Sequence, residues 1–199
     1  VLTTDIVGAS DFIVDCGTAK TLVLAEAVYD DIQFPVSGAK VPASNAPTWT
    51  TFTTNTNEYT FDIDDYVDLQ ANEMSHWWKE GTLVYPHIHT TTNGANASGS
   101  SYYAKYTIYF AYADDDDGWA EVSRDLEVEI PDGTADMTAL FVNGTSVDLA
   151  GLTIGTQVKI RVKRIAATSG TEFPNEIFIT QVGIHALKDT MGSRSIATK

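Results

Sequence analysis

YYAKYTIYFAYADDDDGWAEVSRDLEVEI, residues 102–130, decides the fold class of this chain. In its first half every second residue is aromatic or aliphatic: Tyr102, Ala104, Tyr106, Ile108, Phe110 and Tyr112. In its second half an apolar face, interrupted only by Arg124, alternates with a mostly acidic one. Because successive side chains of a β-strand point to opposite faces, this alternation predicts two long strands with one wet face. The acidic loop that ends at Gly118 should join them as a hairpin.

The same period of two recurs on both sides of the hairpin. Strands are predicted in 58–71, 82–92, 156–165 and 175–187, the last covered on both faces, and a shorter hairpin with its turn at Asn143-Gly144 is predicted in 137–152. Residues 35–57 are rich in Pro, Ala, Thr and Asn and should form an extended loop. Eight or more strands without helical periodicity indicate an all-β, two-sheet antiparallel β-sandwich, a jelly roll.

The first part of the chain is expected to stand apart from this sandwich. At 199 residues the chain is long enough for one domain with its own core, which we place at residues 26–199. Residues 1–25 resemble two short strands without a partner close in sequence, and an unpaired edge needs pairing. We therefore predict an extended N-terminal arm that contacts another subunit or another protein through Phe12, Ile13 and Val14.

The charge pattern argues against nucleic acid as a partner and suggests which faces of the protein lie close together. A formal net charge of −15 argues against direct binding of nucleic acid, and no apolar run approaches the roughly 20 residues of a membrane span. Two strands carry like charges on one face each, as an acidic ladder (Glu121, Asp125, Glu127 and Glu129) and a basic ladder (Lys159, Arg161 and Lys163). Since opposite ladders relieve each other's repulsion, they are predicted to lie close together, within one sheet or across a subunit boundary.

One segment has the spacing of a metal site. The His-x-His pair His87 and His89 would share one face of a strand, as the metal sites of cupin-like barrels require, and His185 is the plausible third ligand. However, no acidic residue follows the pair in HTTTNGANAS, where a cupin would have a Glu. The sequence therefore favours structural histidines, with no metal and no cofactor.

The adjacent Trp77 and Trp78 are open to two interpretations. Exposed, they would form a stacking platform for a surface glycan; otherwise one packs into the core and the other against a neighbour. Cys16, the one cysteine, lies in an apolar run without an activating motif and is expected to be an inert thiol.

Three stretches together resemble a group of tailed-phage virion proteins. They are VYDDIQFPVSGAKVPASNAPTWTTF (28–52), HWWKEGTLVYPHIHTTT (76–92) and DTMGSRSI (189–196). In that group a Y-K-E-G-T-x-x-x-P-H-x-H segment follows a strand and the domain ends near D-T-x-G-S-R; here Trp78 replaces the usual Tyr. The resemblance covers residues 26–199. It implies a β-sandwich at the particle surface, such as a head decoration, a spike or a tail accessory protein, and gives the histidines no catalytic role.

These observations lead to one expected function and two alternatives. We expect a non-enzymatic virion protein that forms a homotrimer, joins other virion proteins through its arm and contacts neither nucleic acid nor a membrane. The first alternative is a carbohydrate-binding or host-adsorption module that uses Trp77, Trp78 and the aromatic strand 102–112. The second is a cupin-like metalloprotein, which needs His87, His89 and His185 to converge.

Overall fold

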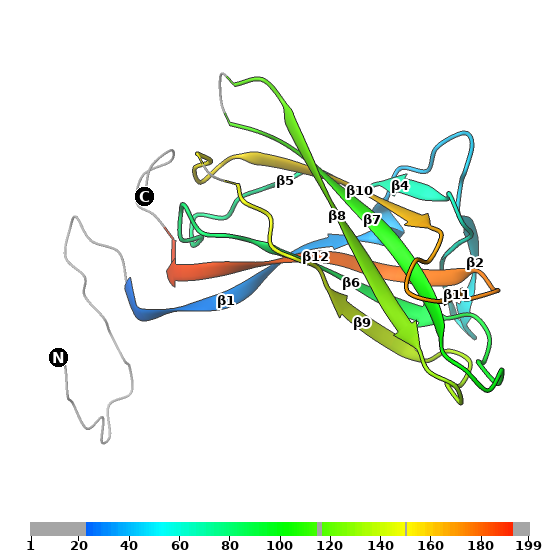
Figure 1. Cartoon of the computed structure of the whole chain (residues 1–199). Helices are drawn as coiled ribbons and strands as arrows, with labels where there is room; N and C mark the ends of the chain where they lie inside the picture. The colour runs from blue at the N-terminus through cyan, green and yellow to red at the C-terminus, as the bar shows by residue number, and fades with distance from the viewer. Residues whose placement is uncertain (1–22, 115–116, 150, 193–199) are drawn as a thin grey trace.

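The computed structural model describes residues 23–114, 117–149 and 151–192 of the chain (Figure 1). The described residues contain twelve strands, one 3-10 turn (η1, Val36–Gly38) and no α-helix. The strands form two six-stranded sheets packed face to face, and the second layer runs obliquely across the first (Figure 1). The predicted all-β, two-sheet sandwich is therefore confirmed.

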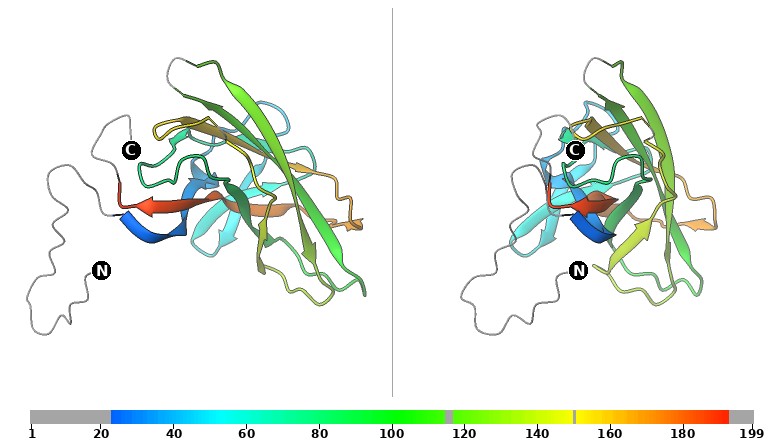
Figure 2. Two further views of the ribbon diagram at one scale, coloured as in Figure 1. Left: turned by 60° about the vertical axis from the view of Figure 1, so that its left-hand side comes forward. Right: turned by 90° about the vertical axis from the view of Figure 1, so that its left-hand side faces the viewer.

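The first sheet is built around the last strand of the chain. Its members are β1 (Val23–Pro35), β2 (Thr48–Thr53), β3 (Thr56–Phe61), β6 (Tyr85–Thr92), β9 (Ala139–Asn143) and β12 (Ile177–Thr190). The long β12 pairs with β6 along one edge and with β1 and β3 along the other, in antiparallel register throughout. The start of β1 and the end of β12 lie side by side at one end of the molecule (Figure 2).

The second sheet contains the hairpin predicted in 102–130. Its members are β4 (Tyr66–Asp68), β5 (Asn72–Glu73), β7 (Tyr102–Ala113), β8 (Ala120–Ile130), β10 (Gln157–Ile165) and β11 (Thr171–Glu172). The central β7 pairs with β8 on one side and β10 on the other, both antiparallel, and the short β11 joins β7 in parallel. The hairpin of β7 and β8 and the strand β10 thus agree with the sequence-based prediction.

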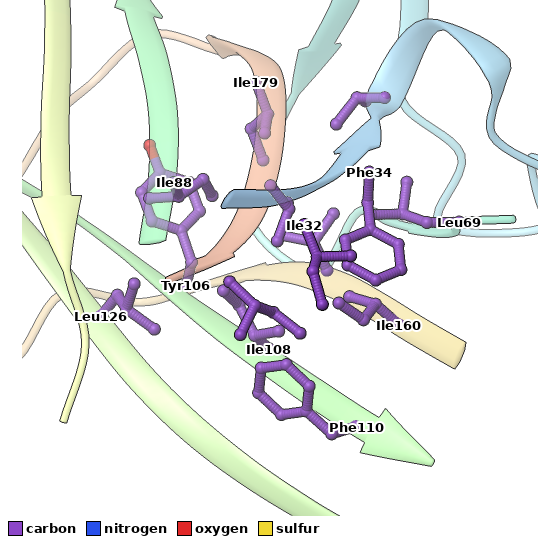
Figure 3. Packing of buried hydrophobic residues seen from close by; sticks show 14 of the residues in the cluster. Ile32, Phe34, Leu69, Ile88, Tyr106, Ile108, Phe110, Leu126, Ile160 and Ile179 are labelled. Carbon is purple, nitrogen blue, oxygen red and sulfur yellow. The ribbon is translucent and has the colours of Figure 1, made fainter. Parts of the chain in front are cut away.

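The core lies between the two inner faces. Residues of even number in β7 and β10, such as Ile108, Phe110 and Ile160, meet Ile32, Phe34 and Ile88 from the first sheet (Figure 3). These side chains are at most 5% exposed. Burying a large aliphatic or aromatic side chain stabilises the fold by roughly 1.5–3 kcal/mol. The alternating apolar residues that predict the strands therefore also stabilise the packing of the two sheets.

One buried residue breaks the apolar pattern. Arg164 of β10 points inward, opposite Tyr106 of β7, and is 1% exposed. Its guanidinium donates to the carbonyl oxygens of Phe61, Phe173 and Asn175 and to the carboxylate of Glu172, at 2.7–2.9 Å. This arginine therefore ties the end of β3 to the segment that precedes β12.

Four local predictions need correction. The strand predicted in 58–71 is divided between the two sheets, because β3 ends at Phe61 in the first sheet and β4 begins at Tyr66 in the second. The hairpin predicted in 137–152 does not form, because β9 pairs with β6 and the chain continues along β6 to the bridge between Val147 and Val84. Gly144 is not a hairpin turn: it packs so tightly that a Cβ would lie 3.0 Å from Pro86 and 3.1 Å from Leu126.

The other two corrections concern the start of the sandwich. The loop predicted in 35–57 contains β2 and the start of β3, whose Thr-rich sequence pairs as a hairpin at the edge of the first sheet. Strand β1 begins at Val23, so it crosses the predicted boundary between residues 25 and 26.

Candidate functional site

Three neighbouring strands place a carboxylate and two imidazoles on the outer face of the first sheet. Antiparallel pairing sets Asp31 of β1 opposite His185 of β12, and sets His87 of β6 opposite Gly183 of β12. Since the neighbours Ile32, Ile184 and Ile88 point into the core, Asp31, His185 and His87 point away from it. The pairing register of β1, β12 and β6 therefore brings these three side chains together on one face.

His87 is buried even though it lies on an outer face. Its side chain is 1% exposed, and its ring lies over the backbone of β12 at Gly183. A Cβ at Gly183 would lie 2.4 Å from both Cε1 and Nε2 of His87. The absence of a side chain at this one position of β12 thus makes the space that the imidazole fills.

Aromatic rings enclose His87 on its other sides. The His185 ring stacks on it at 4.1 Å between centroids, and the His89 ring meets it edge to face at 5.3 Å. The ring of Phe141 in β9 lies against both His87 and His89, with 5.4 and 5.0 Å between ring centroids. The pair predicted from His-x-His spacing therefore does share a face, and His185 joins it.

The surroundings keep His87 neutral at neutral pH. Burial lowers the pKa of His87, the nearby His185 and His89 lower it further, and the opposing effect of Asp31 leaves the pKa at about 4. The Nδ1 atom of His87 has no hydrogen-bond partner among the described residues. A neutral imidazole carries a proton on one ring nitrogen and a lone pair on the other, and that lone pair can bind a ligand.

Asp31 completes the cluster, and the sequence analysis missed it. Its Oδ1 lies 3.1 Å from Nε2 of His185. One donor atom from each of Asp31, His87 and His185 lies within 4.8 Å of the others. The alternation around VYDDIQF could have placed Asp31 on a face, but the partner of that face depends on the pairing of β1 with β12, which are about 150 residues apart.

Around this cluster the outer face of the first sheet is aromatic. We call this surface the outer-face patch; its residues are Tyr29, Tyr85, His89, Phe141 and His185. Tyr29 is 56% exposed and Phe141 is 46% exposed; they stand on the edge strands β1 and β9, on either side of β12 and β6. A shallow pocket of about 390 Å³, lined by Tyr29, Tyr85, Asn143 and His185, opens beside the cluster.

The structure does not support a platform of two exposed tryptophans. Trp78 is 0% exposed and packs in the core, so it cannot stack on a glycan. Trp77 is half-buried against the core, with the amino group of Lys188 at 5.5 Å from its ring. The packing alternative is therefore the correct one for Trp78.

The two charge ladders lie on one outer face, that of the second sheet. Strand β7 separates them, so that Glu121, Ala111 and Lys159 form one row and Asp125, Thr107 and Lys163 another. The ladder residues pair chiefly with other partners: Asp125 with Lys105, Arg161 with Asp68 and Lys163 with Asp64, at 3.1, 2.6 and 2.6 Å. Glu127 and Glu129 accept hydrogen bonds from the segment 168–169 and from Ser101, respectively.

Coulombic contact between the ladders is weak but present. The Asp68 carboxylate raises the pKa of Arg161, and Glu121 contributes in the same direction. The predicted proximity therefore takes the form of a shared sheet face with one strand between the ladders.

A groove runs along the basic side of this face. It has a volume of about 1020 Å³, and its charged and aromatic lining residues are Lys40, Tyr66, Asp68, Tyr109, Glu121, Lys159, Arg161 and Lys163. Arg161 stacks over Tyr66 at 4.3 Å, and Lys159 lies 4.8 Å from the ring of the exposed Trp119. Four of the 12 lysines and arginines of an acidic chain thus meet in one groove.

Two of the remaining expectations concern the arm and membranes. Phe12, Ile13 and Val14 lie outside the described residues. Across the described part of the chain, no helix has the length and apolar character needed to cross a membrane. In comparisons with known proteins, no family model and no curated protein matches this chain.

Proposed function

We propose that the chain is a non-enzymatic structural protein of a tailed-phage virion, located at the particle surface and assembled as a homotrimer. The observation that carries the proposal is the outer-face patch, where exposed aromatic side chains on β1 and β9 flank the histidines of β6 and β12. The resemblance of WKEGTLVYPHIH to virion proteins supports it, because this segment contains the first part of β6, which supplies Tyr85 and His89.

An exposed aromatic surface of this kind favours association. Contiguous apolar surface on a soluble protein marks an interaction site, and aromatic residues and histidines at the centre of a patch can be buried at little electrostatic cost. The net charge of −15 makes copies of the chain repel one another elsewhere. A contact between copies is therefore best made through the outer-face patch.

The arm of a neighbouring copy is the occupant that we propose for the patch. Residues 1–22 precede β1, which itself supplies Tyr29 to the patch. The segment from Val14 to Val23 spans up to about 30 Å when extended, which is enough to reach past the edge of one domain. Phe12, Ile13 and Val14 would then cover the exposed rings of Tyr29 and Phe141 and stabilise the contact by roughly 1.5–3 kcal/mol each if fully buried.

Deletion of residues 1–22 tests the proposal. The truncated protein should fold, because every described strand lies after residue 22, but it should be monomeric in solution and absent from particles assembled in its presence. Phe141→Glu should weaken the trimer in the full chain, whereas Ile63→Glu should not, since Ile63 is similarly exposed but lies in the turn before β4. Normal incorporation of the truncated protein into particles would overturn the proposed attachment.

The groove on the second sheet favours a second candidate function, carbohydrate binding during host adsorption. Aromatic rings and a surplus of positive charge together suit sugars that carry carboxylate or sulfate groups. The experiment is binding of the full chain to immobilised acidic and neutral polysaccharides. Binding to the acidic ones should be lost in a Lys159→Ala, Lys163→Ala double variant and retained in Lys79→Ala, which lies outside the groove; equal binding by all three proteins would exclude this candidate.

A further inference from the structure

We propose that Asp31, His87 and His185 form a binding site for a divalent transition-metal ion of the Zn²⁺ type on the outer face of the first sheet. The proposal goes beyond the proposed virion function, and the site shares His185 with the outer-face patch. It rests on three donor atoms from three adjacent strands, which lie within 4.8 Å of one another. A site built on paired strands has its donors fixed by backbone register, which keeps the cost of assembling it low.

The strongest reason is the state of His87. A buried polar atom is normally hydrogen-bonded, yet Nδ1 of His87 has no partner among the described residues and the side chain is 1% exposed. Ring packing alone explains the stack with His185, but it leaves unexplained why a polar ring rather than an apolar one fills the space over Gly183. Coordination of a metal ion by one of its ring nitrogens would account for a polar ring at this buried position.

The donor set selects the class of metal. Two imidazole nitrogens and one carboxylate oxygen suit Zn²⁺, Ni²⁺ or Cu²⁺, whereas Ca²⁺ and Mg²⁺ prefer oxygen ligands alone. Asp31 supplies a negative charge that partly compensates the charge of the ion. Solvent would complete the coordination shell.

The cluster needs only a small rearrangement to bind. Metal bonds of about 2.0–2.1 Å in a tetrahedral site set donor atoms about 3.3–3.4 Å apart. Oδ1 of Asp31 and Nε2 of His185 are already 3.1 Å apart, and the widest separation within the cluster is at most 4.8 Å. The side chains of His185 and Asp31 are 29% and 38% exposed, so they can rotate toward His87 and an ion can reach them from solvent.

Titration of the full chain with ZnCl₂, followed by calorimetry, tests the site. The wild-type protein should bind one Zn²⁺ per chain, and its melting temperature should rise with Zn²⁺ concentration as ligand linkage requires. Asp31→Asn and His185→Gln change side chains that are about one-third exposed and should leave the fold intact, while each weakens Zn²⁺ binding by about tenfold or more. His87→Gln should do the same, with circular dichroism used to check its fold.

The two remaining histidines serve as controls. His76 lies in the loop before β6, outside the cluster, so His76→Gln should bind Zn²⁺ as the wild type does. His89 contacts His87 but is not among the three donors, so His89→Gln should retain most of the affinity. Absence of stoichiometric binding, or equal binding by the wild type and all three ligand variants, overturns the proposal. Loss of binding in His89→Gln with full binding in Asp31→Asn overturns the ligand set.

Discussion

Gly183→Ala is the sharpest probe of how β12 accommodates His87. In an extended strand this substitution ordinarily stabilises a protein by about 0.4–1 kcal/mol, because alanine loses less backbone entropy on folding. At Gly183, however, the new Cβ would lie 2.4 Å from Cε1 and Nε2 of His87. Because His185, His89 and Phe141 enclose the ring, His87 cannot simply swing aside.

The expected cost follows from this clash. Overpacking of an enclosed site costs typically about 1–3 kcal/mol, so Gly183→Ala should destabilise the protein where an unhindered site would be stabilised. For a chain of this size each kcal/mol lowers the melting temperature by about 2–4 °C. Differential scanning calorimetry should therefore show a decrease of roughly 2–12 °C.

Two further variants isolate the contact. Gly38→Ala is the matched control, because its Cβ would meet nothing within 4 Å, and it should be neutral or slightly stabilising. In a His87→Ala background the cost of Gly183→Ala should disappear, which a double-mutant cycle measures directly. If Gly183→Ala is as stable as Gly38→Ala in the wild-type background, the position assigned to His87 is wrong.

Two other predictions concern residues that hold the sandwich together. Arg164→Met should lower the free energy of unfolding by about 3–5 kcal/mol, because it leaves the Glu172 carboxylate and three carbonyl oxygens, two of them buried, without their donor. A change below 1 kcal/mol in urea denaturation would contradict this. Burial alone would raise the pKa of Glu127, but hydrogen bonds from Ser169 and Thr168 lower it from 4.5 to about 2. A lowered pKa stabilises the fold above pH 4.5 and loses that effect as the pH falls toward 2. Glu127→Gln should thus cost on the order of 1 kcal/mol at pH 7 and little at pH 2, and an equal cost at both pH values would refute the assignment.

The sequence predicts well whatever depends on local alternation. The hairpin 102–130, the strand 156–165 and the shared face of His87 and His89 follow from a period of two, which does not depend on the rest of the chain. Arg164 continues the inward face of β10, but a charged residue was not expected there, because its partners come from the ends of other strands.

The sequence alone does not predict which distant segments pair with each other. Asp31 joins His185 only because β1 pairs with β12 in one register, and a shift of one residue would turn Asp31 into the core. The segment 139–147 follows the edge of β6 instead of folding back at Asn143-Gly144, since pairing with an existing edge satisfies its backbone without a turn. Local turn residues therefore predicted a hairpin that long-range pairing overrode.

Cryo-electron microscopy of purified particles tests the proposed virion function most directly. The account predicts a β-sandwich density at the particle surface in groups of three, with the outer faces of β6, β9 and β12 in contact with residues of a neighbouring copy. Tyr29 and Phe141, exposed in the isolated chain, should be covered in that density. Particles that lack this chain, or that carry it as isolated monomers with the outer-face patch open to solvent, would contradict the proposal.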